Sequence, residues 1–417
     1  MKVSTVGPVA LAAAALALAA CSDSNPEGGL NVPAQYEFAS QFVDGVSSVS
    51  YQGQICRHVL ISALDNAVRD AAEIAKTDYR GAAVPYYDDT IVGALAAQDT
   101  AQTLDLSLPV PEGQDTLGAL CGSKHLDEKF AGNDTVTDHR DWNTQFEGVS
   151  GESSAEAYLR RLLQEVSEQA EQGTNAPGAP HYVSPEGLDY AQLIQKFLLG
   201  AVAFSQGTDD YLDDATAGKG LQTAFAQDGD APYAVLEHQF DEGYGYFGAA
   251  RAYGDRSDAV NRSGVVDDNG DNVIDLNVEH NFGASTNAAK RDEGSDPAAK
   301  TDFTGAAFLA LRTGRAIISE AGVAFADMSP AQQDDLLAAR DAAVADLGGG
   351  RLVDRLQEVV QRVDQQRVAG AADADRPVAD QLHALQLHRV GRGAPGHARD
   401  PHRPVVHRVE PAVGGVE

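Results

Sequence analysis

Apolar residues recur at helical spacing through most of this chain, and the alternating patterns typical of strands are nearly absent. Between Ile55 and Lys76 the apolar side chains fall on one stripe and the charged side chains lie off it, as in an amphipathic helix. Further helices are predicted at 153–166, 184–205, 303–320 and 330–347. The sequence therefore predicts a mainly α fold, a single helical-bundle-like domain with long inserted loops.

Polar residues mark the expected starts of three of these helices. Ser153 and Glu156 have the spacing of a capping box. Ser184 and Ser329 each precede a proline, which is favoured at the first helical position. We therefore expect helices to begin directly after these serines, and the chain from Gln206 onward to leave the helical pattern as an acidic, turn-rich insert.

The densest group of chemically active side chains lies in YAVLEHQFDEGYGYFG, residues 233–248. If this segment is helical through Glu242, then His238 and Glu242 share one face at i,i+4, and Glu237 and Asp241 share another. The two pairs are candidate ligands for a transition metal. One alternative is an acidic helix end whose carboxylates are solvated.

A second alternative is a buried structural network. Four ionisable groups on two helical turns would repel one another unless a cation neutralised them. Side chains such as Arg57, Lys196 or Arg315 could take that role. The glycines that follow predict a tight turn at Gly245-Tyr246-Phe247-Gly248, which would end the helix against the core.

Residues 1–20 are typical of a bacterial secretion signal, and their apolar stretch is too short to span a membrane. The run LAAC that ends at Cys21 resembles a lipobox, which implies cleavage before Cys21 and lipid attachment to it. A plain signal peptide with a chance cysteine is the alternative. Residues 21–34 are expected to form a flexible tether. Because Ser22 follows the cysteine, we expect the lipid to anchor the protein in the outer membrane of the cell envelope, on its periplasmic or surface face.

The chain is strongly acidic, with a formal net charge of -31 over 417 residues. Such a charge disfavours nucleic acid and anionic lipid surfaces as partners and favours cations or basic proteins. Beyond Cys21 the sequence contains only Cys56 and Cys121. In an oxidising periplasm these two are expected to form one disulfide, with two buried free thiols as the alternative.

An acidic stretch, DDNGDNVIDLNVE at 267–279, resembles a calcium loop. Calcium prefers several oxygen ligands that converge from one short loop, and oxygen-bearing side chains stand at positions 1, 3, 5 and 9. The glycine of the sharp turn is displaced, because Asn272 occupies position 6, and the last acidic residue comes one step after position 12. A solvated acidic loop is the alternative. The candidate ligands are Asp267, Asn269, Asp271, Asp275 and Glu279.

Several motifs in order give the chain a family resemblance. They are YQGQICRH at 51–58, the run 187–200, EHQFDEGYGYFG, the acidic loop continuing into EHNFGASTNAAKRD, and TGRAI at 313–317. Over residues 36–320 the chain resembles bacterial lipoproteins with domain of unknown function 4856.

The resemblance implies a mostly helical surface or periplasmic lipoprotein without an established activity. Genes of such lipoproteins often lie near those of imelysin-type lipoproteins and TonB-dependent receptors. The resemblance therefore points to metal acquisition, iron in particular, with other envelope metal-uptake proteins as candidate partners.

The helical domain is expected to span 35–350, because residues 351–417 have an atypical composition. They contain no Ser, Thr, Asn, Ile, Lys, Phe, Tyr, Trp, Met or Cys. Such a restricted alphabet is what an out-of-frame reading of GC-rich DNA produces, and a disordered tail is expected from 370 onward. The alternative is a metal-binding tail that uses His383, His388, His397, His402 and His407.

Two classes of function remain. The first is a non-enzymatic, lipid-anchored protein that binds a cation or metal through its acidic surface and the segment around His238. The second is a metal-dependent hydrolase of the imelysin kind, with His238 and Glu242 as metal ligands and Glu237 or Asp241 as the base. The sequence contains no HExxH, GxSxG, Walker or GxHxxE motif, so the first class is preferred.

Overall fold

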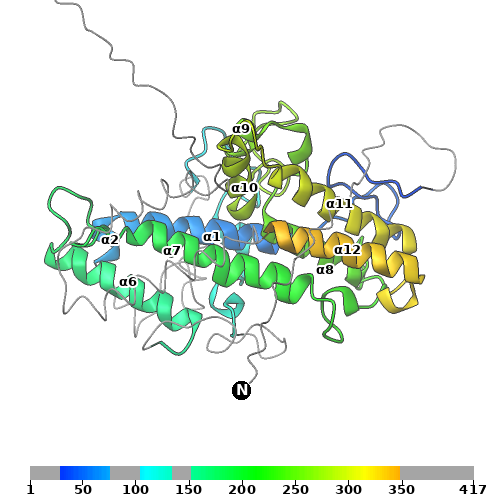
Figure 1. The fold of residues 1–417 in the computed structure, drawn as a ribbon, viewed down its shortest axis with the longest axis horizontal. Helices are drawn as coiled ribbons and strands as arrows, with labels where there is room; N and C mark the ends of the chain where they lie inside the picture. The colour runs from blue at the N-terminus through cyan, green and yellow to red at the C-terminus, as the bar shows by residue number, and fades with distance from the viewer. Residues whose placement is uncertain (1–28, 76–103, 134–151, 348–417) are drawn as a thin grey trace, which may run out of the picture.

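The computed structural model in Figure 1 describes residues 29–75, 104–133 and 152–347. The predicted signal, Cys21, the start of the tether and the atypical tail at 351–417 lie outside these residues. The described residues are mainly helical and contain no strand, which confirms the predicted fold class. None of the described helices is long and apolar enough to cross a bilayer.

Ten α-helices lie in the described residues, with shorter 3-10 and π segments between them. The α-helices are α1 (Gln52–Arg69), α2 (Ala71–Ile74), α5 (Leu117–Cys121), α6 (Ala155–Gln172), α7 (Tyr190–Leu198), α8 (Val235–Phe247), α9 (Asp258–Asn261), α10 (Gly283–Glu293), α11 (Phe303–Ala321) and α12 (Pro330–Leu347). The 3-10 turns are η2 (Asp127–Lys129), η5 (Gly220–Gln222), η6 (Tyr253–Asp255) and η7 (Phe325–Asp327). The π segments are η3 (Leu199–Phe204) and η4 (Gln206–Tyr211).

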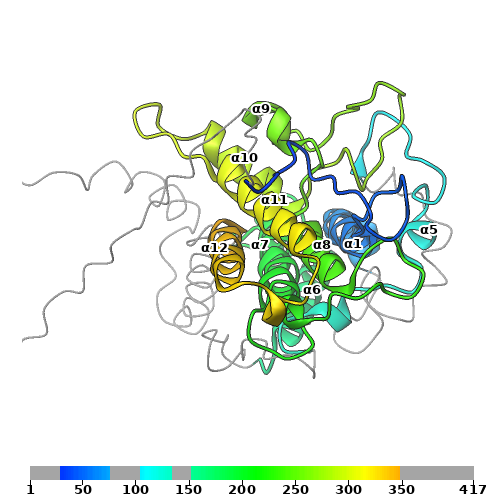
Figure 2. The same cartoon turned by 90° about the vertical axis from the view of Figure 1, so that its right-hand side faces the viewer.

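Viewed along the long axis, α7 and α8 lie between α1 and α12, and α10 and α11 cross this group obliquely (Figure 2). The core between the helices is rich in aromatic side chains. Tyr36, from the segment before α1, stacks on Tyr244 of α8 with ring centroids 3.5 Å apart. Because α8 contacts α1, α10 and α11, residues of this helix are held from several sides.

Several helix boundaries differ from the sequence prediction. The first predicted helix breaks at Asp70, whose carboxylate accepts the N–H groups of Ala72 and Glu73 and caps α2. The start of α6 follows Ser154, whose hydroxyl accepts the N–H of Ala157, so the cap lies one residue after Ser153.

The expected start at Ser184-Pro185 is wrong. The Ser184 hydroxyl accepts the N–H of Leu188 in a turn, and Gly187 adopts a φ of 87°. The side chain of Asp189 then accepts the N–H of Gln192, so α7 begins at Tyr190. The helical path continues through η3 and η4 to Tyr211, where the sequence predicted a loop. The hydrogen bonds of Ser184 and Asp189 to the backbone of this turn therefore set the start of α7, and the serine-proline pair does not.

The tight turn expected at Gly245–Gly248 is also wrong, because α8 continues to Phe247 and ends at Gly248, with a φ of 72°. The glycines inside α8 serve close packing. A Cβ at Gly245 would lie 2.7 Å from the Cβ of Tyr51, and one at Gly243 would lie 2.8 Å from Cγ of Leu212. By contrast, α11 and α12 occupy nearly the residues that their apolar patterns predicted.

Candidate functional site

Of the four candidate ligand residues on α8, Glu237 and Asp241 bind a buried arginine. Arg315 on α11 donates from Nη1 to Oε1 of Glu237 at 2.8 Å and from Nε to Oδ1 of Asp241 at 2.8 Å. All three side chains are fully buried. The i,i+4 spacing places the two carboxylates on one helix face, and the guanidinium fork spans both of them.

The remaining polar atoms of this network are also hydrogen-bonded. The Tyr36 hydroxyl donates to Oδ1 of Asp241 at 2.9 Å, and the backbone N–H of Ser50 donates to Oδ2 at 3.3 Å. Nη2 of Arg315 donates to the Ser48 hydroxyl at 2.7 Å. The other oxygen of Glu237 accepts the N–H of Ala234 at 2.9 Å, which caps the start of α8. The first Glu237 oxygen also accepts the hydroxyl of Ser319, which in turn contacts Arg315.

Burial and charge act in opposite directions on this network. Burial raises the pKa of Asp241, and the adjacent Arg315 lowers it. Burial also raises the pKa of Tyr36 well above its ordinary value, which keeps its hydroxyl protonated as a donor. Because each carboxylate has a cationic partner and further donors, the group behaves as a satisfied structural network.

The other two residues, His238 and Glu242, lie at the partly exposed edge of α8. Nδ1 of His238 is 3.0 Å from the carbonyl oxygen of Ser50, and the Tyr233 ring stacks on the imidazole with centroids 4.4 Å apart. Nε2 of His238 is 3.9 Å from Oε1 of Glu242. That Glu242 oxygen accepts the side-chain amide of Gln54 at 2.8 Å. Burial raises the pKa of Glu242, and His238 opposes the shift.

The structure therefore separates the four predicted site residues into a buried network and an edge pair. Of the three cations that the sequence offered as partners, only Arg315 binds these carboxylates. Arg57 and Lys196 make no ion pair with them, and burial lowers the pKa of Lys196 to about 8. As a general base, Glu237 or Asp241 would have to release Arg315 first, which opposes that role.

The acidic loop wraps around its first carboxylate. Oδ1 of Asp267 accepts the N–H groups of Gly270 at 2.7 Å and Asp271 at 3.2 Å, and Oδ2 accepts the N–H of Asn272 at 3.0 Å. Asn272 has a φ of 64°, the left-handed conformation that glycine supplies in calcium loops. Asparagine tolerates this conformation better than most residues, so the displaced glycine does not prevent the sharp turn.

The later acidic residues of the loop also accept backbone N–H groups. Oδ1 of Asp271 binds the N–H of Val273 at 2.8 Å, and Oδ1 of Asp275 binds the N–H of Asn277 at 2.8 Å. Glu279 is buried, and its two oxygens accept the N–H groups of Asp268, Asn269 and Asp275. Glu279 therefore stabilises the loop conformation through hydrogen bonds to the loop backbone.

No group of three or more acidic, histidine or cysteine side chains in the described part of the chain is arranged to hold a metal ion. The two cysteines of the domain are bonded, with Cα atoms 5.1 Å apart and 65 residues of separation in sequence. This bond ties α1 to α5.

Residues 127–276 match the family described as Domain of unknown function (DUF4856). The chain carries a DUF4856 domain. This match confirms the family resemblance, over a shorter range than the motifs suggested. No curated protein and no solved structure gave a significant match. The DUF4856 match includes Glu237 and Asp241, whereas Arg315 lies beyond it, so the buried network joins the matched region to the helix that follows.

Several residues of the site carried no recognisable signal in the sequence. Tyr36 and Ser48 lie in the irregular segment before α1, and Ser319 lies one turn after Arg315. Ordinary serines and tyrosines occur throughout the chain, and only the tertiary fold brings these three to the carboxylates of α8. The i,i+4 spacing of Glu237 and Asp241 and the presence of Arg315 were the available clues.

Proposed function

We propose that this DUF4856 protein is a lipid-anchored, non-enzymatic protein of the bacterial cell envelope that binds calcium through the loop at 267–279. The observation that carries the proposal is the conformation of Asp267 to Asn272, in which three consecutive backbone N–H groups surround one carboxylate. A loop already folded in this way loses less conformational entropy when a cation binds.

Charge supports the same proposal. Among the described residues, Arg256 pairs with Asp268, but no Lys or Arg lies within ion-pair distance of Asp267, Asp271 or Asp275. Oδ2 of Asp267 and Oδ1 of Asp271 each accept a single N–H, and such an oxygen keeps further acceptor capacity for a cation. Asp267, Asp271 and Asp275, with the amide oxygen of Asn269, are the proposed ligands. A cation would relieve the repulsion between their charges, and calcium tolerates an irregular set of oxygens better than magnesium does.

The hydrolase hypothesis receives less support from the geometry. It assigned the base to Glu237 or Asp241, and both carboxylates bind Arg315. The edge pair of His238 and Glu242 remains a proposed second site for a transition metal, which would need ligands besides these two. The lipobox and the family resemblance support a role beside the metal-uptake proteins of the envelope.

Thermal unfolding tests the calcium site. A ligand that binds only the folded state stabilises it, by about 2.7 kcal/mol when its concentration is a hundred times Kd. We expect millimolar calcium to raise Tm relative to a chelator, and magnesium to raise it less. Asp271→Asn should remove most of the calcium effect, whereas Asp230→Asn, at an exposed position away from the loop, should retain it. Equal Tm values in calcium and in chelator would contradict the proposal.

A further inference from the structure

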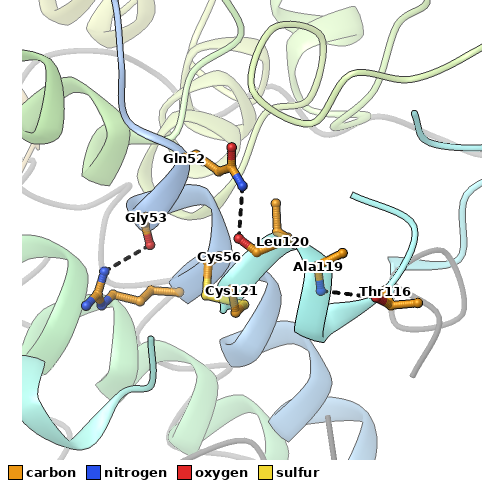
Figure 3. Close-up of a disulfide and its surroundings, with 8 residues drawn as sticks. Gln52, Gly53, Cys56, Thr116, Ala119, Leu120 and Cys121 are labelled. Carbon is orange, nitrogen blue, oxygen red and sulfur yellow. Dashed lines mark hydrogen bonds between the residues drawn. A yellow bond between two sulfur atoms is a disulfide. The ribbon is translucent and has the colours of Figure 1, made fainter. Parts of the chain in front are cut away.

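The start of α1 is joined to the end of α5 by covalent and hydrogen bonds (Figure 3). The disulfide connects Cys56 to Cys121, and Nε2 of Gln52 donates to the carbonyl oxygen of Leu120 at 3.1 Å. Gly122 follows with a φ of 58°, and the N–H of Lys124 donates to the carbonyl oxygen of Cys121 at 3.0 Å, so the chain turns directly after α5. These contacts fix the position of the loop after α5 relative to the first turn of α1.

Two cationic side chains converge on the first turn of α1 as a result. A Cβ at Gly53 would lie 2.9 Å from Cε of Lys124 and 3.3 Å from Nη1 of Arg57. Nη1 of Arg57 donates to the carbonyl oxygen of Gly53 at 3.0 Å, so the guanidinium folds back over the start of its own helix. Both side chains therefore lie directly against the backbone of Gly53.

Arg57 is a buried cation that forms no ion pair with any described residue. It is 5% exposed, its Nε has no hydrogen-bond partner, and no carboxylate of the described residues lies within ion-pair distance. Arg315, the other buried arginine of the described residues, binds two carboxylates. An arginine that forms no ion pair is unexpected in this chain, because 62 acidic residues are present against 31 Lys and Arg. A buried charge is costly unless something pairs with it.

Near Arg57 lie a second donor that has no partner among the described residues and the carboxylates of Glu242 and Asp210, the latter paired with Lys219. The buried hydroxyl of Tyr246 has no partner, and Arg57 is near enough to lower its pKa, against the larger effect of burial. Glu242 lies in the same region, but its hydrogen bonds are to the side-chain amides of Gln54 and Gln239.

The backbone of α1 adds to the positive potential. The helix has 18 residues, its N-cap residue Tyr51 makes no side-chain capping bond, and its first turn contains no acidic residue. The N-terminal end of a helix carries partial positive charge and favours anions. In many helices a capping or acidic side chain supplies this negative partner, and here none does.

We propose that the first turn of α1, with Arg57 and Lys124, binds a small oxyanion, namely the carboxylate or phosphate group of a small-molecule ligand. Arg57 supplies charged donors from a buried position, and Lys124 supplies a second charge from the solvent side. The disulfide holds Lys124 over the site. The proposal is independent of calcium binding, because the loop at 267–279 contributes none of these groups.

Isothermal titration of the purified full-length chain tests this site, with sodium phosphate and sodium succinate as probes. Sodium chloride at matched ionic strength is the reference, and calcium is removed beforehand on a chelating resin, so that no soluble polycarboxylate competes with the probes. We expect one or both probes to bind the unmodified chain. Binding of phosphate alone assigns a phosphate group to the ligand, and binding of succinate alone assigns a carboxylate.

Two substitutions and one control locate the binding. Arg57→Gln and Lys124→Gln should each weaken the affinity about tenfold or more, the loss expected for one charge-assisted hydrogen bond. Lys300→Gln, an exposed lysine beside Asp258, should leave the affinity unchanged. Lys124 is exposed, so its variant remains decisive if Arg57→Gln fails to fold. The proposal is overturned if neither probe binds, or if Lys124→Gln binds as tightly as the unmodified chain.

Discussion

Arg315 neutralises two carboxylates that the helical spacing places one turn apart on α8. Removing the guanidinium would leave Glu237 and Asp241 buried without a cation. We expect Arg315→Met to lower the free energy of unfolding by about 3–5 kcal/mol, as for other broken buried pairs. Denaturant titration with circular dichroism measures this loss.

The matched control is Arg262→Met. Arg262 pairs with Glu293 at the surface, with half of its side chain exposed, so its removal should cost at most about 1 kcal/mol. Similar losses for the two variants would show that the buried network has no special role in stability.

His58 gives the fold a pH dependence. Burial lowers its pKa to about 4, and its Nε2–H donates a hydrogen bond of 3.1 Å to the carbonyl oxygen of Gly245. In the unfolded chain the imidazole takes up its second proton near pH 6.5, so the stability gained from a neutral His58 is present above that pH and is lost as the pH falls toward 4. The loss amounts to about 3 kcal/mol at most.

Denaturation between pH 7.5 and 4.5 measures this effect. His58→Gln should reduce the decline in unfolding free energy over that interval. The decline should not vanish, because burial lowers the pKa of His280 to about 3 and acts in the same direction. An unchanged slope in the His58 variant would contradict the assignment.

At the scale of elements, α1 and α8 approach closely because Gly245 has no side chain. A Cβ there would lie 2.7 Å from the Cβ of Tyr51 and 2.8 Å from that of Gln54. We expect Gly245→Ala to destabilise the protein by about 1–3 kcal/mol, since overpacking outweighs the better helix propensity of alanine. Gly29→Ala, where no atom lies within 4 Å, is the control in the same denaturation assay. If both variants were neutral, the close packing would not depend on this glycine.

The helices differ in how far the sequence could predict them. The ranges of α11 and α12 followed from local patterns, because apolar periodicity and the Ser329 start acted together there. In α8 the glycines favoured a turn locally, and tertiary packing against α1 kept the helix intact. The start of α7 moved to Tyr190 because the turn chemistry of Ser184 and Asp189 competed with the expected cap.

The candidate site was predictable only in part, for a related reason. Helical periodicity paired Glu237 with Asp241 and His238 with Glu242, and the structure keeps both pairings. Periodicity carries no information on which distant residue meets each pair. Arg315, 74 residues after Asp241, could be named only as one of several cations, and Tyr36 could not be named at all.

For the whole molecule, membrane attachment is predicted to depend on Cys21. A lipid at this residue should keep the protein in the membrane fraction after a salt wash, and Cys21→Ala should release it. Fractionation of cells that express each form measures the change. Firm membrane attachment of the variant would contradict the lipid anchor. It would not bear on the proposed calcium site.

Calcium content measures the central claim most directly. The full-length chain is dialysed to equilibrium against buffer of known calcium concentration, so that free calcium is equal on both sides of the membrane. Elemental analysis should then find about one calcium per chain above the buffer level, as expected for a single loop site. Asp267→Asn should lose this calcium, and Asp230→Asn should keep it. An unmodified chain with no calcium above the buffer level, or an Asp267 variant that retains all of it, would contradict the proposed site.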